Sequence, residues 1–281
     1  MKTIFKSSIL LLTVVSAILL TMNACIKGKG DVVQELLTVD SFTGVKLKGS
    51  FDVEVVLGGQ QSVTAEGNQN IIDRIIARVN SDGVLELELE KGNYKEFQLK
   101  IYVSVPVATY FAITGSGDMS IVEDENLTFD DLQLFISGSG NMSGIGEFRV
   151  SNTSFAEITG SGNMNFNLNS SLLDVTNSGS GNMIFDIIAN EIDADITGSG
   201  NLNCTGFAPT QILNVSGSGN YKGFFVESQN TTVDLSGSGN AECKVNTQLN
   251  ATLSGSGSVY YKGSPVINAT ITASGEVIDA N

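Results

Sequence analysis

The tetrapeptide Gly-Ser-Gly-Asn, or a close variant, recurs from residue 115 almost to the end of this 281-residue chain. Successive repeats start 18–23 residues apart. A fixed period near twenty residues is typical of solenoid proteins, in which each repeat packs only on its neighbours. The repeat starts are Gly115, Gly138, Gly160, Gly179, Gly198, Gly217, Gly237, Gly255 and Ala273.

Residues around each pair of glycines alternate between apolar and polar. In the repeat at Gly198, Ile196 and Leu202 occupy even positions relative to the start, whereas Thr197 and Ser199 occupy odd ones. A period of two indicates extended backbone with one buried face. We therefore predict an all-β chain that folds as a right-handed parallel β-helix (β-solenoid), with 18–23 residues per coil and a corner at the glycines. The hand follows the general preference of parallel crossovers.

Residues 1–24 have the layout of a secretory signal peptide, with two lysines before an apolar run from residue 9 to residue 20. The run is too short to span a bilayer. Cys25 comes directly afterwards, which resembles the bacterial lipoprotein signal, in which this cysteine is lipidated and becomes the mature N-terminus. We predict a lipid anchor, such as palmitate, at Cys25, and localisation as an outer-membrane lipoprotein on its periplasmic or surface face. A plain secreted protein is the alternative.

The chain beyond residue 24 carries 13 basic and 30 acidic side chains, a net charge of −17. So acidic a surface argues against binding nucleic acid and against electrostatic docking on anionic lipid. There is no histidine, which removes His-based catalytic triads and most zinc sites. We expect no cofactor and no metal.

The part of the chain before the regular repeats has a different organisation. We predict a tether at residues 25–37 and one β-helix domain at 38–281, in which 38–110 form irregular first coils and a cap and 111–281 form the regular coils. Five apolar residues in this region recur at helical spacing, and predict a short amphipathic helix that covers the first edge of the solenoid. They are Ile71, Ile72, Ile75, Ile76 and Val79.

Two short segments precede the regular coils: Phe-Thr-Gly-Val at 42–45 and Gly-Ser-Phe-Asp-Val-Glu-Val at 49–55. Together with Gly-Ser-Gly-Asn coils behind a secretion signal, they resemble the putative auto-transporter adhesin, head GIN domain family, over about residues 38–279. The resemblance implies a β-helical body and an envelope lipoprotein of Bacteroidetes-type bacteria. It transfers no site residues, because the family has none established.

The outward positions of the coils form the candidate site. Ser or Thr one residue before each start, Ser one after, and Asn three after would form ladders about 4.8 Å apart from coil to coil. Such a lattice suits a repetitive glycan or the edge of another protein; the alternative is that it only seals the corner. The candidate residues are Thr159, Ser161, Asn163, Ser178, Ser180, Asn182, Thr197, Ser199, Asn201, Ser216, Ser218, Asn220, Ser236, Ser238 and Asn240.

A second hypothesis is a polysaccharide-active β-helix enzyme, a lyase or a hydrolase. Glu157, Asp195 and Asp234 lie three residues before their starts, on alternate coils. Their expected separation of about 9.6 Å is at the upper edge of the range for inverting hydrolysis. However, no Arg or Lys repeats beside them, so we favour a non-enzymatic adhesin or binding protein. The sequence assigns neither a ligand nor an oligomeric state.

Overall fold

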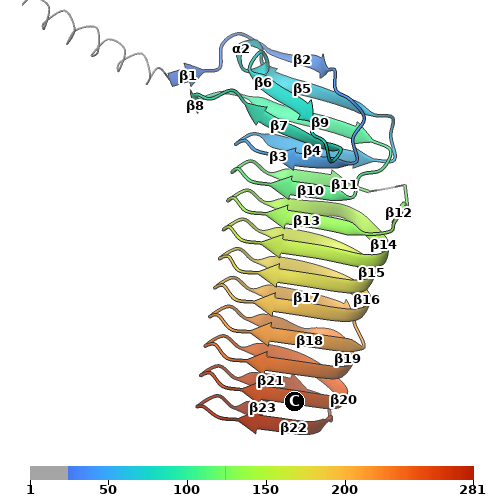
Figure 1. The fold of residues 1–281 in the computed structure, drawn as a ribbon, viewed down its shortest axis with the longest axis vertical. Coiled ribbons are helices and arrows are strands. Elements are labelled where there is room, and N and C mark those ends of the chain that lie inside the picture. Colours follow the sequence, from blue (N-terminus) through green and yellow to red (C-terminus); the bar gives the residue numbers. More distant parts are fainter. Residues whose placement is uncertain (1–24, 124) are drawn as a thin grey trace, which may run out of the picture.

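A computed structural model describes residues 25–123 and 125–281, and these residues form a β-solenoid of about nine turns (Figure 1). The predicted signal peptide at 1–24 lies outside the described residues. The predicted all-β solenoid is confirmed, and the described part of the chain contains a single short helix.

The regular coils are built from strands that pair in parallel with the preceding and following coil. Corresponding residues of successive repeats are direct neighbours, as in the pairs Met164–Met183 and Phe166–Phe185. The strands are β10 (Tyr110–Ile113), β11 (Met119–Val122), β12 (Thr128–Phe129), β13 (Leu132–Ile136), β14 (Met142–Ile158), β15 (Met164–Asn177), β16 (Met183–Ile196), β17 (Leu202–Phe207), β18 (Thr210–Val215), β19 (Tyr221–Leu235), β20 (Ala241–Leu253), β21 (Val259–Lys262), β22 (Val266–Ile271) and β23 (Val277–Asp279).

Each coil has one strand segment that leads into its glycine corner and one that leaves it. We call the sheets formed by these segments the pre-corner sheet and the post-corner sheet. The glycine corners stack along one edge of the solenoid, at the left in Figure 1, and the chain bends back at the opposite edge. Inward residues of both sheets form one continuous core, in which Phe166 and Phe185 are 2% and 1% exposed.

The corners need glycine because neighbouring coils approach too closely for a side chain. A Cβ atom on Gly198 would lie 2.0 Å from the carbonyl oxygen of Gly179 in the preceding coil, and one on Gly200 would lie 1.8 Å from that of Gly181. The close approach allows the Gly179 carbonyl to accept two hydrogen bonds, from the N–H groups of Ser199 at 2.9 Å and Gly200 at 3.2 Å. Glycine thus determines how tightly the coils stack.

The first coil in the sequence is not the first coil in space. It consists of β3 (Gly44–Leu47) and β4 (Asp52–Leu57). These strands pair with β10 and β11 on one side and with β7 (Val84–Leu89) and β9 (Leu99–Val105) on the other. The chain between β4 and β7 crosses the end of the stack as β5 (Ser62–Asn68), which runs antiparallel to β9.

The predicted cap helix is only partly correct. Helix α2 covers only Gln69–Ile72, with Ile71 and Ile72 buried. Residues Ile75–Val79 form strand β6, antiparallel to β7, so the prediction of helix there was wrong. Pairing with the open edge of β7 satisfies backbone groups that a helix would leave unmatched on that edge. The end of the solenoid is therefore closed mainly by antiparallel strands.

Residues 25–37 are also more ordered than a tether. Cys25–Lys27 form β1, which pairs with β8 (Asn93–Lys95), and Val32–Leu37 form β2, antiparallel to β5. Val33 and Leu37 of β2 pack against the core. In an extended strand, residues an even number of positions apart lie on the same face. Val33 and Leu37 therefore both face the core, and this contact favours a strand over a tether.

At the other end of the described chain, β22 and β23 pair only with the preceding coil. All residues of the last pre-corner strand, β22, are exposed, including Val266 at 68%. No helix in the described part of the chain is long and apolar enough to cross a membrane.

Candidate binding surface

The asparagine members of the predicted lattice form a continuous hydrogen-bonded ladder. The Asn182 Oδ1 atom accepts bonds from the Asn201 backbone N–H at 3.2 Å and from Asn201 Nδ2 at 2.8 Å. The same pattern joins Asn201 to Asn220 and Asn220 to Asn240. The bonds between side chains start at Asp118, whose carboxylate accepts from both the N–H and the Nδ2 of Asn141, and the Asp118 N–H in turn donates to Asp52 Oδ1 at 3.2 Å. A carboxylate can only accept, which suits the first member of a ladder with this direction.

The hydroxyl members of the lattice behave differently from the asparagines. All ten predicted Ser and Thr residues are exposed at the glycine edge, and the structure gives none of them a side-chain hydrogen bond to another described residue. The asparagines therefore hold the edge in register, while the hydroxyls project from it with their bonding capacity free. The ten residues are Thr159, Ser161, Ser178, Ser180, Thr197, Ser199, Ser216, Ser218, Ser236 and Ser238.

The structure also shows a feature that sequence reasoning missed, a row of aromatic side chains on the outer face of the pre-corner sheet. The ring centroids of Tyr110 and Phe135 lie 5.3 Å apart, and those of Phe135 and Phe155 lie 5.4 Å apart. All three side chains are partly exposed. The available signal was their odd positions relative to Gly115, Gly138 and Gly160, where most other repeats carry polar residues.

Carboxylates follow the aromatic row on the same face. Asp174 pairs with Phe155 in the strand register and Asp193 with Asp174. Burial, with the charges of Asp193 and Asp195, raises the pKa of the Asp174 carboxyl, and burial with Asp195 raises that of Asp193. These carboxyl groups lie close enough that each disfavours the charged form of the others. Above their pKa values, this part of the face carries a concentrated negative charge.

The carboxylates of the enzyme hypothesis lie in one outward column but do not form a pair. Thr176 separates Glu157 from Asp195, and Asn214 separates Asp195 from Asp234. The Asp195 Oδ1 atom accepts a hydrogen bond from Asn214 Nδ2 at 2.9 Å.

Neither thiols nor metal ligands supply an obvious reactive centre in the described chain. Cys204 and Cys243 are free and buried, and burial raises the pKa of the Cys243 thiol to about 12. A thiol with so high a pKa is a poor nucleophile near neutral pH. Among residues 25–123 and 125–281, no three Asp, Glu, Cys or His side chains are placed to hold a metal ion.

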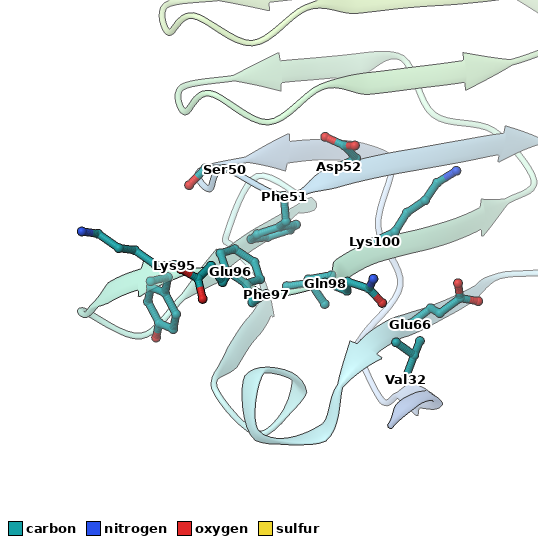
Figure 2. A pocket seen from close by; sticks show the side chains of 12 residues that line it. Val32, Ser50, Phe51, Asp52, Glu66, Lys95, Glu96, Phe97, Gln98 and Lys100 are labelled. Carbon is teal, nitrogen blue, oxygen red and sulfur yellow. The ribbon is translucent and has the colours of Figure 1, made fainter. Parts of the chain in front are cut away.

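A hollow of about 640 Å³ lies at the cap, between β2, β9 and the first coil (Figure 2). Figure 2 shows the rings of Phe51 and Phe97 close together, with the charged ends of Lys95 and Lys100 directed away from them. Lys100 is bound to Glu54 at 2.8 Å. The hollow contains none of the predicted lattice residues, and two of its charged groups, Lys100 and Glu96, are paired with Glu54 and Lys27 outside its lining.

The fold and this edge define a β-solenoid with a repetitive, hydroxyl-rich lateral surface. The chain belongs to the family described as "putative auto-transporter adhesin, head GIN domain", whose model matches residues 41–171 and 147–265. The family indicates a protein of the cell envelope or surface. No curated protein is similar enough to this chain to count as a relative.

Several solved structures share the fold, among them three from Parabacteroides species. A "putative adhesin" from Parabacteroides distasonis has 19% identity and a TM-score of 0.69, with 92% of this chain and all of that one covered. A "putative lipid binding protein" from the same organism has 21% identity, a TM-score of 0.66 and the same coverage. A "putative adhesin" from Parabacteroides merdae has 20% identity and a TM-score of 0.66, covering 92% of this chain and 99% of that one.

Proposed function

We propose that this protein is a non-enzymatic outer-membrane lipoprotein that binds a repetitive glycan along its glycine edge. The observation that carries the proposal is the difference between the two kinds of lattice residue: the asparagines bond to each other, whereas the hydroxyls are exposed and bond to no other described side chain. Unpaired hydroxyls at a repeat of about 4.8 Å offer a ligand donors and acceptors at regular intervals. Because the asparagine ladder fixes their positions, little side-chain ordering is needed on binding.

Anchoring through Cys25 would orient this surface. Cys25 is exposed and begins β1 at the cap, at the opposite end from the C-terminal coil (Figure 1). Nine of the 13 basic residues beyond position 24 lie between positions 27 and 100, so the acidic excess is concentrated in the distal coils. An anionic membrane surface would repel that distal part and tolerate the cap. The solenoid would then stand away from the membrane with its glycine edge accessible from the side.

A screen of the mature chain against immobilised neutral and acidic glycans tests the proposal. The informative variant is the triple replacement Ser180→Ala, Ser199→Ala and Ser218→Ala, which removes three consecutive hydroxyls of one column. A typical hydrogen bond contributes about 0.5–1.5 kcal/mol, so we expect at least a tenfold loss of affinity. Ser171→Ala with Thr247→Ala, at the opposite edge, is the matched control and should bind normally.

The same screen tests the alternative, a polysaccharide-active enzyme. If the glycans acquired new reducing ends or unsaturated products, and Asp195→Asn abolished this turnover, the chain would be a hydrolase or lyase. The separation of Glu157 from Asp195 by Thr176, and the bond from Asn214 to Asp195, favour binding without cleavage. If no glycan bound, the proposed glycan-binding function would be wrong.

A further inference from the structure

A small groove lies beside the first hydroxyls of the glycine edge, on the outer face of the pre-corner sheet. Its volume is about 190 Å³, below the ~300–1,000 Å³ of pockets for drug-sized ligands. Tyr110 and Phe135 form part of its lining, with ring planes inclined at 37° to each other. With their centroids 5.3 Å apart the two rings are in contact with each other, so a small ring-shaped group would stack on their exposed faces and not between them.

Ala112 forms the floor of the groove. In the strand register it lies between Lys46 and Phe135, in a column whose side chains point outward. It is nevertheless only 2% exposed, because its larger neighbours cover it. A larger residue at this position would fill part of the groove beside the rings. The groove therefore exists because this one outward position holds a methyl group.

Five of the residues that line the groove have polar or charged side chains, which form its rim. Thr114, Ser137 and Thr159 contribute hydroxyls from consecutive coils of the glycine edge. Glu157 and Lys46 contribute a carboxylate and an ammonium group, and Lys46 forms no ion pair with another described residue. Thr159 also belongs to the hydroxyl lattice, so the groove continues that surface.

We infer that this groove binds one pyranose ring of a glycan that carries no carboxylate or sulfate on that ring. The C–H groups on one face of a pyranose are weakly positive and complement the negative face of an aromatic ring, while its hydroxyls extend sideways to a polar rim. A lipid chain would leave the rim hydroxyls and charges without partners, at a cost in free energy. A protein partner usually covers about 800 Å² on each side, far more than this groove offers.

The charge next to the groove sets the class of sugar. Glu157 lies in the groove, and Asp174 and Asp193 follow on the next two coils of the same face. The single ammonium group of Lys46 does not balance these three carboxylates, so the net charge around the groove is negative and repels an acidic sugar but not a neutral or amino sugar. The inference rests on the proposed function and makes it more specific, because it names the ring-binding position and excludes acidic glycans there.

The test measures binding of the mature chain to cello-oligosaccharides and chitin oligosaccharides, with oligogalacturonates as the acidic probe. Phe135→Ala removes one aromatic ring, and Ala112→Leu fills the groove without removing either ring. Stacking of a ring on an aromatic side chain contributes on the order of 1–3 kcal/mol for nucleobases, so each variant should weaken neutral binding about tenfold. Phe225→Ala, a 76% exposed aromatic position on the post-corner side, is the matched control and should leave binding unchanged.

The outcomes separate the two proposals. If the wild-type chain binds a neutral oligosaccharide and both groove variants bind it equally well, the groove inference is wrong and the proposed glycan function stands. Tighter binding of oligogalacturonates than of neutral probes, weakened by either groove variant, would also overturn the inference. Should the wild-type chain bind no glycan but bind phosphatidylcholine vesicles in a way that Ala112→Leu abolishes, both proposals fail and the groove is a lipid site. Circular dichroism of each variant establishes that it is folded.

Discussion

Replacing Gly198 with alanine tests the packing of the corners quantitatively. The new Cβ would lie 2.0 Å from the Gly179 carbonyl oxygen and 2.7 Å from the carbonyl carbon of Ser178. Real Cβ contacts are almost never shorter than 3.0 Å, so the two coils must separate by roughly 1 Å at this point. That movement would stretch four backbone hydrogen bonds of 2.9–3.2 Å, two to the Asn177 carbonyl and two to the Gly179 carbonyl.

The expected cost follows from these bonds. At about 0.5–1.5 kcal/mol each, loss of four bonds destabilises the fold by about 2–6 kcal/mol. The last repeat provides a natural comparison, because Ala273 stands where the other repeats have glycine. There the Gly255 carbonyl accepts from Gly275 at 3.3 Å, and within the described chain Ser274 makes no bond to it, unlike its counterparts in the other coils. The last described strands, β22 and β23, each pair with one strand of the preceding coil, whereas β16 and β17, on either side of Gly198, pair with strands on both sides.

Urea denaturation followed by circular dichroism measures this cost, since the chain has no tryptophan. Ser199→Ala, at the adjacent exposed position, should change the free energy of unfolding by less than about 0.5 kcal/mol. If Gly198→Ala were as mild as Ser199→Ala, the coils would not be held at the close approach on which the corner argument depends.

Three further predictions address the anchor, the acidic face and the core. Cys25→Ser should move the protein from the membrane fraction to the soluble fraction, and unchanged fractionation would contradict lipidation at this residue. The pKa of Asp193 is raised in the folded state, because burial and Asp195 disfavour its charged form. The resulting loss of folding stability is absent below the ordinary pKa of 3.8 and grows as the pH rises from there through the raised pKa. Asp193→Asn should therefore raise the Tm at pH 7, with a smaller effect as pH falls. Phe185→Ala, in the core, should cost about 3–5 kcal/mol, whereas truncation of the neighbouring Ile184, 49% exposed, should cost far less.

The regular coils could be predicted from sequence because their inward and outward positions repeat with little noise. The alternation around Gly198 identifies both the buried column and the exposed hydroxyls, and the structure bears out both. The role of the glycines was only partly predictable. The sequence places them at the corner, but the reason for them, the carbonyl of the preceding coil, depends on the distance between coils.

The cap could not be predicted as well, because its strands pair with residues distant in sequence. Ile71 to Val79 has helical spacing, yet β6 forms since β7 offers an open edge. The groove could not be predicted from the sequence for a similar reason. Tyr110 and Phe135 lie in adjacent outward columns of different coils, so their proximity depends on the strand register and on the small size of Ala112 between them.

The dependence of affinity on glycan length tests the central claim most directly. Calorimetric titration of the mature chain with a neutral oligosaccharide series, from one sugar upwards, measures whether the repeated hydroxyls act together. A lattice of nearly nine coils is on the order of 40 Å long. We therefore expect Kd to fall with each added sugar until the oligosaccharide spans the whole glycine edge. Equal affinity for one sugar and for the longest oligomer would show that the lattice does not bind the ligand.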